Sequence, residues 1–179
     1  MNDNVMKALR ACPLFAGMRE MEIELTLDNV PHQCVSLPPH EVYALAGMPC
    51  RHVDIVVSGK LICRMAALSG KQVEVSRLRS GNLVAPAFFF SKDRCLPVSV
   101  ETEGAVELFR MKPETLKALM DTDETLRMNF IRILSNIDVF LTKKMKILSL
   151  FTVREKVAYL LLERAGEQGS DEIHLERSR

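Results

Sequence analysis

The sequence predicts an α+β fold in which a small antiparallel β-roll of the double-stranded jelly-roll type precedes one long helix. Gly59, Gly70 and Gly81 stand eleven residues apart, each after a Ser and a short run of aliphatic or β-branched residues. Runs broken in this way predict successive hairpins, because glycine supplies the positive φ of tight turns. Residues 123–150, by contrast, contain no Gly or Pro and carry apolar residues at helical spacing.

Composition and charge are those of an ordinary folded domain. The chain has 179 residues, 47% of them hydrophobic and 26% charged, and its formal net charge is +1. Any contact with nucleic acid must therefore come from local charge. The first residues lack the features of a signal peptide, and no apolar run approaches the ~20 residues of a membrane helix. We therefore expect a cytoplasmic protein that does not bind a membrane.

The five cysteines are scattered without any C-x-x-C pair, at Cys12, Cys34, Cys50, Cys63 and Cys95. An odd number without close grouping predicts reduced thiols and disfavours both a disulfide framework and an iron–sulfur cluster. Because a free cysteine behaves as a small apolar side chain, we expect buried, inert thiols.

Two helices are expected before the first strand, over Asn4–Ala11 and Glu20–Asn29. In the second segment Met, Ile, Leu and Leu occupy alternate positions, and this period-2 pattern by itself would suggest a strand. We favour a helix there, because Glu, Met and Leu are good helix formers.

Residues 33–109 are predicted to be β structure throughout. Pro38 and Pro39 cannot donate to a ladder, so they belong to a turn or a sheet edge. The expected strands are Cys34–Leu37, Val42–Leu45, Val53–Val57, Leu61–Met65, Val73–Arg77, Asn82–Val84, Val98–Thr102 and Val106–Met111.

A short helix is expected from Lys112 to Met120, with Pro113 in its first turn, where a missing N–H costs least. The long helix follows over Asp123–Leu150, capped by Thr122 or Asp123. One apolar stripe along it has the three-four spacing of a coiled-coil seam. This stripe consists of Leu126, Phe130, Ile133, Ile137, Phe140 and Ile147, with Lys144 in the seam.

A roll of this size offers the first stripe no second surface in the same chain, so we expect it to form the interface of a homodimer with a two-fold related copy. A second stripe is expected to pack against the roll, and it consists of Ile131, Leu134, Leu141, Met145 and Leu148.

A further helix is expected over Val153–Ala165, closed by Gly166, followed by a strand at Glu172–Leu175 and the first turn of another helix at Glu176–Arg179. A single helix with several leucines has too little to pack against, so this part has the character of an incomplete domain. The expected organisation is a sensing roll at 1–120, a dimerisation helix at 121–150, and the beginning of a truncated domain at 151–179.

Five segments, in this order, resemble the Crp/Fnr family of transcription regulators. They are the leader CPLFAGM (12–18), the strand VDIVVSGKL (53–61), the turn RLRSGNLV (77–84), the long helix (123–150) and TVREKVAYLLLE (152–163). The resemblance implies a roll like that of cyclic-nucleotide-binding domains, a dimerisation helix, and a winged helix-turn-helix domain that binds DNA in the major groove. The base-reading helix would lie beyond Arg179, so this chain by itself cannot carry sequence-specific recognition.

The ligand cassette departs from the family pattern. Cyclic-nucleotide-binding members carry a Gly-Glu pair for the ribose and, about ten residues later, an Arg for the cyclic phosphate. Here the Gly-Glu place is Ala85-Pro86, and the neighbourhood of the arginine offers Arg94. One point of charge holds a phosphate weakly without the ribose partner, so we expect an effector other than a cyclic nucleotide.

The segment in the place of the ligand cassette is apolar, and it predicts a pocket for an apolar effector. The residues expected to form this pocket are Leu83, Val84, Ala85, Pro86, Phe88, Phe89 and Phe90. Three consecutive phenylalanines cannot all face one side of a strand. The alternative is that these rings plug the roll and that no effector binds. Within the family, the segment resembles regulators of nitrosative-stress and hybrid-cluster-protein genes, which implies haem sensing with a His, Cys or Met axial ligand. No residue is singled out for that role.

Two other functions stay open. A cupin-like small-molecule-binding jelly roll would need clustered metal-binding histidines, and His32, His40 and His52 form no such pair. An effector-free structural dimerisation module is the other. No catalytic motif is present, so we do not expect an enzyme. A basic cluster near the end of the long helix is expected to be a solvated helix face, with phosphate contact as the alternative. It consists of Lys143, Lys144, Lys146, Arg154 and Lys156.

Overall fold

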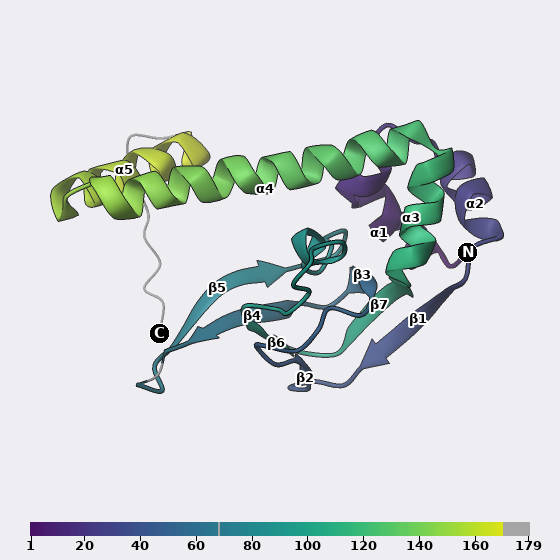
Figure 1. Cartoon of the computed structure of the whole chain (residues 1–179), viewed down its shortest axis with the longest axis horizontal. Helices are drawn as coiled ribbons and strands as arrows, with labels where there is room; N and C mark the ends of the chain where they lie inside the picture. The colour runs from purple at the N-terminus through teal and green to yellow at the C-terminus, as the bar shows by residue number, and fades with distance from the viewer. Residues whose placement is uncertain (68, 170–179) are drawn as a thin grey trace. The chain divides into compact units, whose positions relative to one another are not determined.

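The computed structural model describes residues 1–67 and 69–169 (Figure 1). The chain divides into two units, Met1–Ser135 and Asn136–Arg179. Helix α4 (Glu124–Leu150) begins in the first unit and continues into the second, whereas α5 (Val153–Gln168) belongs to the second unit alone. Each unit is described by itself below.

The first unit contains two antiparallel sheets, one with the strand order β1-β7-β3 and the other with the order β2-β6-β4-β5. The strands are β1 (His32–Leu37), β2 (Val42–Ala44), β3 (Val53–Ser58), β4 (Leu61–Ala66), β5 (Gln72–Leu78), β6 (Ser99–Thr102) and β7 (Val106–Met111). A buried apolar cluster draws on both sheets, including Val56, Leu61, Val100 and Leu108. The two sheets therefore form the predicted roll.

A larger core lies where the helices of the first unit meet the β1-β7-β3 sheet (Figure 1). These elements are α1 (Asp3–Ala11), η1 (Pro13–Phe15), α2 (Glu20–Asp28), α3 (Pro113–Thr122) and the start of α4. Leu9 and Phe15 from the helical side join Ile55 and Phe109 from the sheet, and all four are buried.

The segment with alternating apolar residues is helical, as we favoured. In α2, Ile23 and Leu27 are one turn apart and buried, whereas Met21 and Leu25 are 71% and 69% exposed. The period-2 pattern therefore combines one buried helical face with two apolar side chains in solvent.

The three glycines stand in turns with φ of +80°, +81° and +85°, but they do not form successive hairpins. Only Gly70 joins neighbouring strands of one sheet, β4 and β5. Gly59 connects β3 to β4, which belong to different sheets. A Cβ on Gly59 would overlap the carbonyl oxygen of Ala105 and lie 2.9 Å from Cγ2 of Val106, so this crossing requires glycine for space as well as for φ.

The prediction of a strand at Asn82–Val84 is wrong. Only Leu83 forms an isolated bridge, with Ile55 of β3, and the N–H of Val84 donates to the carbonyl of Asp54 at 2.9 Å. Pairing stops there because Ala85 adopts a left-handed conformation and Pro86 has no N–H to donate.

The expected helices after the roll are present. Asp123 accepts the N–H of Leu126 at 3.0 Å, so it provides the predicted cap near the start of α4. Thr152 and Glu155 form a reciprocal capping box at the start of α5. Gly166 does not end α5, because the helix continues to Gln168 and ends at Gly169, whose φ is +61°. The strand and helical turn expected at 172–179 lie outside the described residues.

The thiols follow the expectation only in part. Cys12, Cys50 and Cys63 are buried, and burial raises the pKa of the Cys12 thiol to about 12. Cys34 and Cys95 are exposed, because Cys34 lies on the edge strand β1 and Cys95 in the segment before β6. Among the described residues, no helix combines the length and apolar character needed to cross a membrane.

Candidate functional site

The segment that replaces the ligand cassette starts between the two cores. Leu83 belongs to the larger core beside the helices, and Val84 to the cluster between the sheets. Ala85 then has φ +52° and ψ +47°, which is uncommon for a residue with a Cβ. The single 3-10 turn η2 (Pro86–Phe88) follows, and the N–H of Phe88 donates to the carbonyl of Ala85 at 3.0 Å.

The three phenylalanines diverge, as their spacing predicts. Phe89 is fully buried and its ring stacks on Phe130 of α4, with centroids 6.2 Å apart. Phe90 is 42% exposed and meets the same Phe130 ring edge to face at 5.6 Å. Phe88 is half-buried against the larger core. Phe89 belongs to the larger core, which includes residues of the roll, and none of the three rings belongs to the cluster between the sheets. The alternative of a plugged roll stays a prediction.

The predicted effector-pocket residues are therefore contiguous but unequally accessible. Leu83, Val84 and Phe89 are buried, whereas Ala85, Pro86 and Phe88 are half-buried and Phe90 is the most exposed. A ligand at this surface would meet the half-buried residues and Phe90 first. The pocket itself stays a prediction.

Arg94, the residue nearest to the family's phosphate-binding arginine, lies in a short backbone ladder. The N–H of Cys50 donates to the carbonyl of Arg94 at 2.8 Å, and the N–H of Leu96 donates to that of Met48 at 2.9 Å. The Arg94 side chain is exposed. No carboxylate accompanies it in the Ala85-Pro86 turn, so the two-point grip on a cyclic nucleotide is absent from this place.

A buried polar network at the end of the roll was missed by sequence reasoning. Asp54 is fully buried and accepts two hydrogen bonds from Arg110, at 2.8 and 2.7 Å, and one from the hydroxyl of Tyr43 at 2.6 Å. Burial and then the charge of Asp54 raise the pKa of Tyr43. An aspartate inside the apolar run VDIVV is a signal that could have revealed the network, because a buried charge requires partners.

A second missed residue holds α4 to the first unit. Asn129 is 3% exposed, and its Nδ2 donates to the carbonyls of Leu14 and Ala16 at 3.0 and 2.8 Å. Its Oδ1 accepts a hydrogen bond from Arg132 at 3.2 Å. The start of α4 is therefore fixed by hydrogen bonds as well as by apolar packing.

The expected dimer stripe has two different environments. Leu126 and Phe130 are buried in the core of their own chain, so the premise that the stripe has no partner there is wrong for these two. Ile133 is half-buried against the same core, Ile137 and Ile147 are half-buried, and Phe140 is 55% exposed. The part of the stripe from Ile137 onward keeps the dimer prediction.

The second stripe has unequal exposure within the first unit. Leu134 is half-buried against the core, but Ile131 is 47% exposed. In the second unit Leu141, Met145 and Leu148 are exposed. The start of α4 instead turns Leu126, Asn129, Phe130 and Ile133 toward the core, and these positions share one helical face at three- and four-residue spacing.

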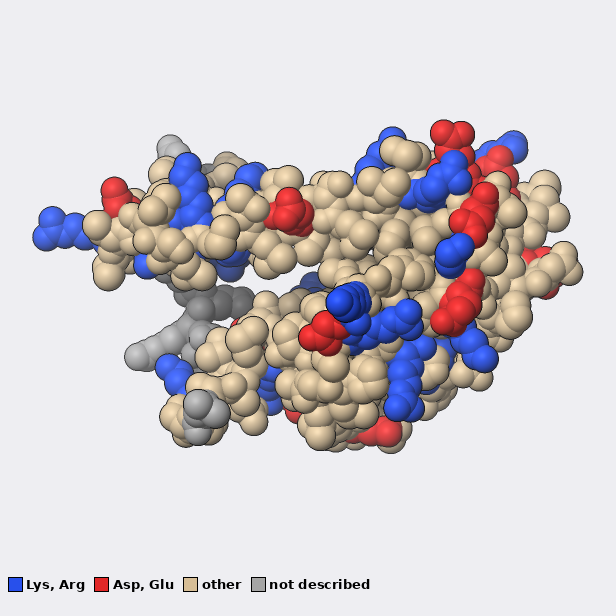
Figure 2. Space-filling model, viewed as in Figure 1, with Lys and Arg blue, Asp and Glu red and all other residues tan. Residues whose placement is uncertain are grey.

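The basic cluster of the second unit is partly engaged by its own helices. The Lys144 ammonium lies 5.4 Å from the centre of the Phe140 ring, and Lys156 donates to the carbonyl of Leu148 at 3.0 Å. Lys143, Lys146 and Arg154 are exposed. On the roll, positive and negative side chains are intermixed on the face shown in Figure 2. Ion pairs in the roll include Arg64 with Glu101 and Lys60 with Glu103.

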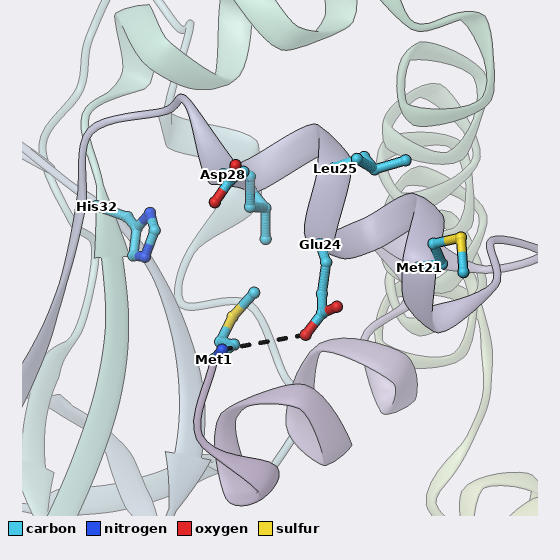
Figure 3. Close-up of a pocket in the computed structure, with 7 residues that line it drawn as sticks. Met1, Met21, Glu24, Leu25, Asp28 and His32 are labelled. Carbon is cyan, nitrogen blue, oxygen red and sulfur yellow. Dashed lines mark ion pairs between the residues drawn. The ribbon is translucent and has the colours of Figure 1, made fainter.

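An acidic recess lies where α2 faces the start of β1 (Figure 3). Its volume is about 410 Å³, and its polar lining is Glu24, Asp28 and His32. The terminal amine of Met1 lies 4.0 Å from Oε1 of Glu24. Of the lining residues only Leu27 is buried, so the carboxylates are solvated and we assign the recess no chemistry.

Two of the three described histidines, His32 and His52, line one cavity at the start of β1 and β3. His32 stacks on Phe109, His40 stands in a turn with φ +58°, and His52 precedes β3. Within residues 1–67 and 69–169, no three His, Cys, Asp or Glu side chains are grouped as a metal site would require.

Comparisons with solved structures identify the fold. A crystal structure of a transcriptional regulator from Thermotoga maritima is 20% identical, with a TM-score of 0.65, over 73% of this chain and 100% of that chain. The catabolite activator protein of Thermus thermophilus is 24% identical, with a TM-score of 0.70, over 88% and 72%. The sensor domain of the transcriptional regulator DNR from Pseudomonas aeruginosa is 15% identical, with a TM-score of 0.62, over 83% and 94%. At these identities the likeness shows a common fold.

No curated protein matches the chain in sequence. The family model for the cyclic nucleotide-binding domain matches residues 34–123, from β1 to the end of α3. This match starts within β1 and includes the other six strands, the segment 83–90 and the Asp54 network, and it covers half of the chain. The chain therefore belongs to the cyclic nucleotide-binding domain family.

Proposed function

We propose that this chain is the sensory and dimerisation part of a Crp/Fnr-type transcription regulator whose effector is not a cyclic nucleotide. The observation that carries the proposal is the contact of Phe89 and Phe90 with Phe130 of α4. The segment that stands in the place of the ligand cassette thereby touches the long helix directly. A ligand that shifts this segment would act on the helix without an intermediate element.

The chemistry of the segment argues against a cyclic nucleotide. Ala85 and Pro86 provide no carboxylate for a ribose, and Pro86 removes a backbone donor from the turn. The accessible surface of the segment comes from Ala, Pro and Phe side chains, which favour an apolar effector.

Haem is one apolar candidate, and it is implied by the resemblance alone. The resemblance implies a His, Cys or Met axial ligand, and no residue is assigned to that role. We derive no step through haem and keep it as a probe.

Dimerisation and DNA binding belong to the same proposal. The apolar side chains of α4 beyond Ile137 need a partner, and a two-fold related α4 provides one of the same length and chemistry. DNA would be bound through a C-terminal helix-turn-helix domain, for which α5 would be the first helix.

Calorimetry of the purified chain with cyclic AMP and cyclic GMP tests the effector class. We expect no saturable heat at micromolar concentrations of either nucleotide. Micromolar binding of either one would overturn this part of the proposal. The double variant Ala85→Gly with Pro86→Glu should also fail to bind, because it restores the ribose partner without the phosphate partner.

An absorption spectrum of the chain titrated with haem tests the apolar alternative. A saturable Soret shift that is weakened by Phe90→Ala would place haem at this segment. A shift insensitive to that variant would exclude the segment as the haem site. The effector-free module would be favoured if neither titration, nor a screen with a hydrophobic fluorescent probe, gave saturable binding that depends on Phe90.

A further inference from the structure

A second cavity lies at the opposite end of the β1-β7-β3 strands from the turn at Gly59, and most of its lining residues are basic or polar. Its volume is about 290 Å³. The polar lining consists of His32, Gln33, His52, Arg110, Lys112 and Thr115, with no Asp or Glu among the lining residues. The volume is close to the lower limit of small-ligand sites, which starts at about 300 Å³.

The register of the sheet brings these residues together. His32 of β1 and Val53 of β3 both pair with Met111 at the end of β7, and Gln33 and Asp54 both pair with Arg110. Helix α3 begins immediately after β7, so Lys112 and Thr115 lie at the same end of the sheet. Three chain segments that are distant in sequence, 31–33, 52 and 110–115, thus meet at one place.

Arg110 is the fixed element of this cavity. Its Nε and Nη2 donate to the two oxygens of Asp54, and Asp54 is held from the other side by Tyr43. These bonds engage two of the five N–H groups of a guanidinium and fix its plane. Arg110 is only 18% exposed, and it contributes to the cavity wall.

Three positive side chains, Arg51, Arg110 and Lys112, act on His52 at this cavity. Burial is the first cause that lowers the pKa of His52, and the positive charge of Arg110 is the second. Arg51 and Lys112 act in the same direction, while Asp54 acts against them. A negatively charged ligand would relieve this repulsion.

We infer that this cavity binds a small phosphate-bearing anion, held by Arg110 and Lys112. An oriented guanidinium, an ammonium and a hydroxyl are the donors that recognise phosphate oxygens, and the Thr115 side chain provides the hydroxyl. The volume exceeds that of a phosphate ion, so a phosphate monoester fits the space better. The cavity shares no lining residue with segment 83–90, so this site is independent of the effector proposal.

The test is a titration of the purified chain with inorganic phosphate, glycerol phosphate, acetate and chloride at constant ionic strength. Calorimetry gives the affinity, and NMR follows the imidazole resonances of His52. We expect saturable binding of the two phosphates, with glycerol phosphate at least as tight, and a shift of the His52 resonances. Acetate binding as tight as phosphate binding, or an equal response to chloride, would overturn the assignment.

Matched variants locate the site. Lys112→Gln should weaken phosphate binding by about tenfold, the effect of losing one hydrogen bond to a charged group. Lys117→Gln removes the same charge five residues further on, within α3. Lys117 pairs with Asp121 and does not line the cavity, so this variant should leave the affinity within about twofold. Equal losses in the two variants would show general charge attraction and no site.

Thr115→Val provides an independent variant that leaves the charge unchanged. This variant should weaken the binding of inorganic phosphate and glycerol phosphate, and its melting temperature should stay within a few degrees of that of the unaltered protein. An unaltered affinity would show that Thr115 is not part of the site. Arg110 is not substituted, because its loss would leave the buried Asp54 without its cationic partner and endanger folding.

Discussion

At the scale of single residues, Phe130 has a role that its position in an apolar stripe did not indicate. The spacing placed it in a seam between two copies, whereas its ring receives Phe89 on its face and Phe90 against its edge. Aromatic pairs of this geometry add about 0.5–1.5 kcal/mol to the burial of their area. Phe130 is thus part of the core and, at the same time, the point at which segment 83–90 contacts α4.

Substitution of the two phenylalanines separates packing from signalling. Phe89→Ala should destabilise the fold by about 3–5 kcal/mol, because it empties a fully buried site. Phe90→Ala should cost about 1–2 kcal/mol, because its ring is 42% exposed. Urea unfolding measures both.

If Phe90 transmits effector binding to α4, Phe90→Ala should abolish the response of the dimer to effector while the fold remains stable. In a form of the protein that carries a DNA-binding domain, operator affinity is the readout. Losses of binding that simply follow losses of stability across both variants would contradict transmission.

Asn129 permits a second prediction at this scale. Asn129→Leu should destabilise the first unit by about 1–3 kcal/mol, because the buried carbonyl of Leu14 and the carbonyl of Ala16 would lose their donor. Asn136→Leu is the control, since Asn136 is exposed on the same helix and its replacement should change stability by less than about 0.5 kcal/mol. Urea unfolding measures the stability of the two variants. Equal losses of stability would show that the hydrogen bonds of Asn129 do not stabilise the start of α4.

At the scale of elements, the same sequence signal, a Ser-Gly pair after an apolar run, occurs in two different kinds of connection between strands. Gly59 and Gly70 have the same φ within one degree, yet one turn crosses between sheets and the other closes a hairpin. The difference lies in the space around them. A Cβ at Gly59 would meet the backbone of residues 105 and 106, whereas a Cβ at Gly70 would meet nothing within 4 Å.

Replacing each of the two glycines by alanine distinguishes the requirement for a positive φ from the requirement for space. Gly70→Ala should cost about 1–2 kcal/mol, the penalty of a left-handed conformation for a residue with a Cβ. Gly59→Ala should cost clearly more, because the backbone at Ala105 must also move. Thermal or urea unfolding measures the loss of stability in both variants. Equal losses would mean that the backbone at Ala105 moves away from the added Cβ without cost.

At the scale of the whole molecule, a roll of the cyclic nucleotide-binding type is joined to a helix whose two halves differ. The first half of α4 is buried against its own roll through Leu126, Asn129 and Phe130. The second half exposes large apolar side chains, among them Phe140, Leu141 and Met145. Exposed apolar side chains in such density are characteristic of an interaction surface.

The dimer prediction is therefore tested in the second half of α4. The double variant Ile137→Asp with Phe140→Asp should give monomers, because each buried apolar side chain contributes about 1.5–3 kcal/mol to an interface. Val139→Asp adds a charge on another face of the helix and should leave the dimer intact. Sedimentation at equal protein concentrations measures both, and a dimeric double variant would refute this interface.

The sequence by itself determined the class of fold, the order of the elements and the apolar character of segment 83–90. These features depend on local signals, namely glycine turns, proline positions and helical or alternating periodicity, which are legible without the rest of the chain. It also fixed the absence of a Gly-Glu pair at Ala85-Pro86. Periodicity identified the apolar faces of α4, but it could not say which of them a partner covers.

Only the tertiary structure decided where those faces lie and which distant groups meet. The rotation of α4 about its axis, which buries Leu126 and Phe130 in their own chain, depends on the contacts of η1 and segment 83–90. The pairing of Asp54 with Arg110, 56 residues away, depends on the register of β3 with β7. Such long-range contacts arise from the joint packing of all elements, and no local pattern of residues specifies them.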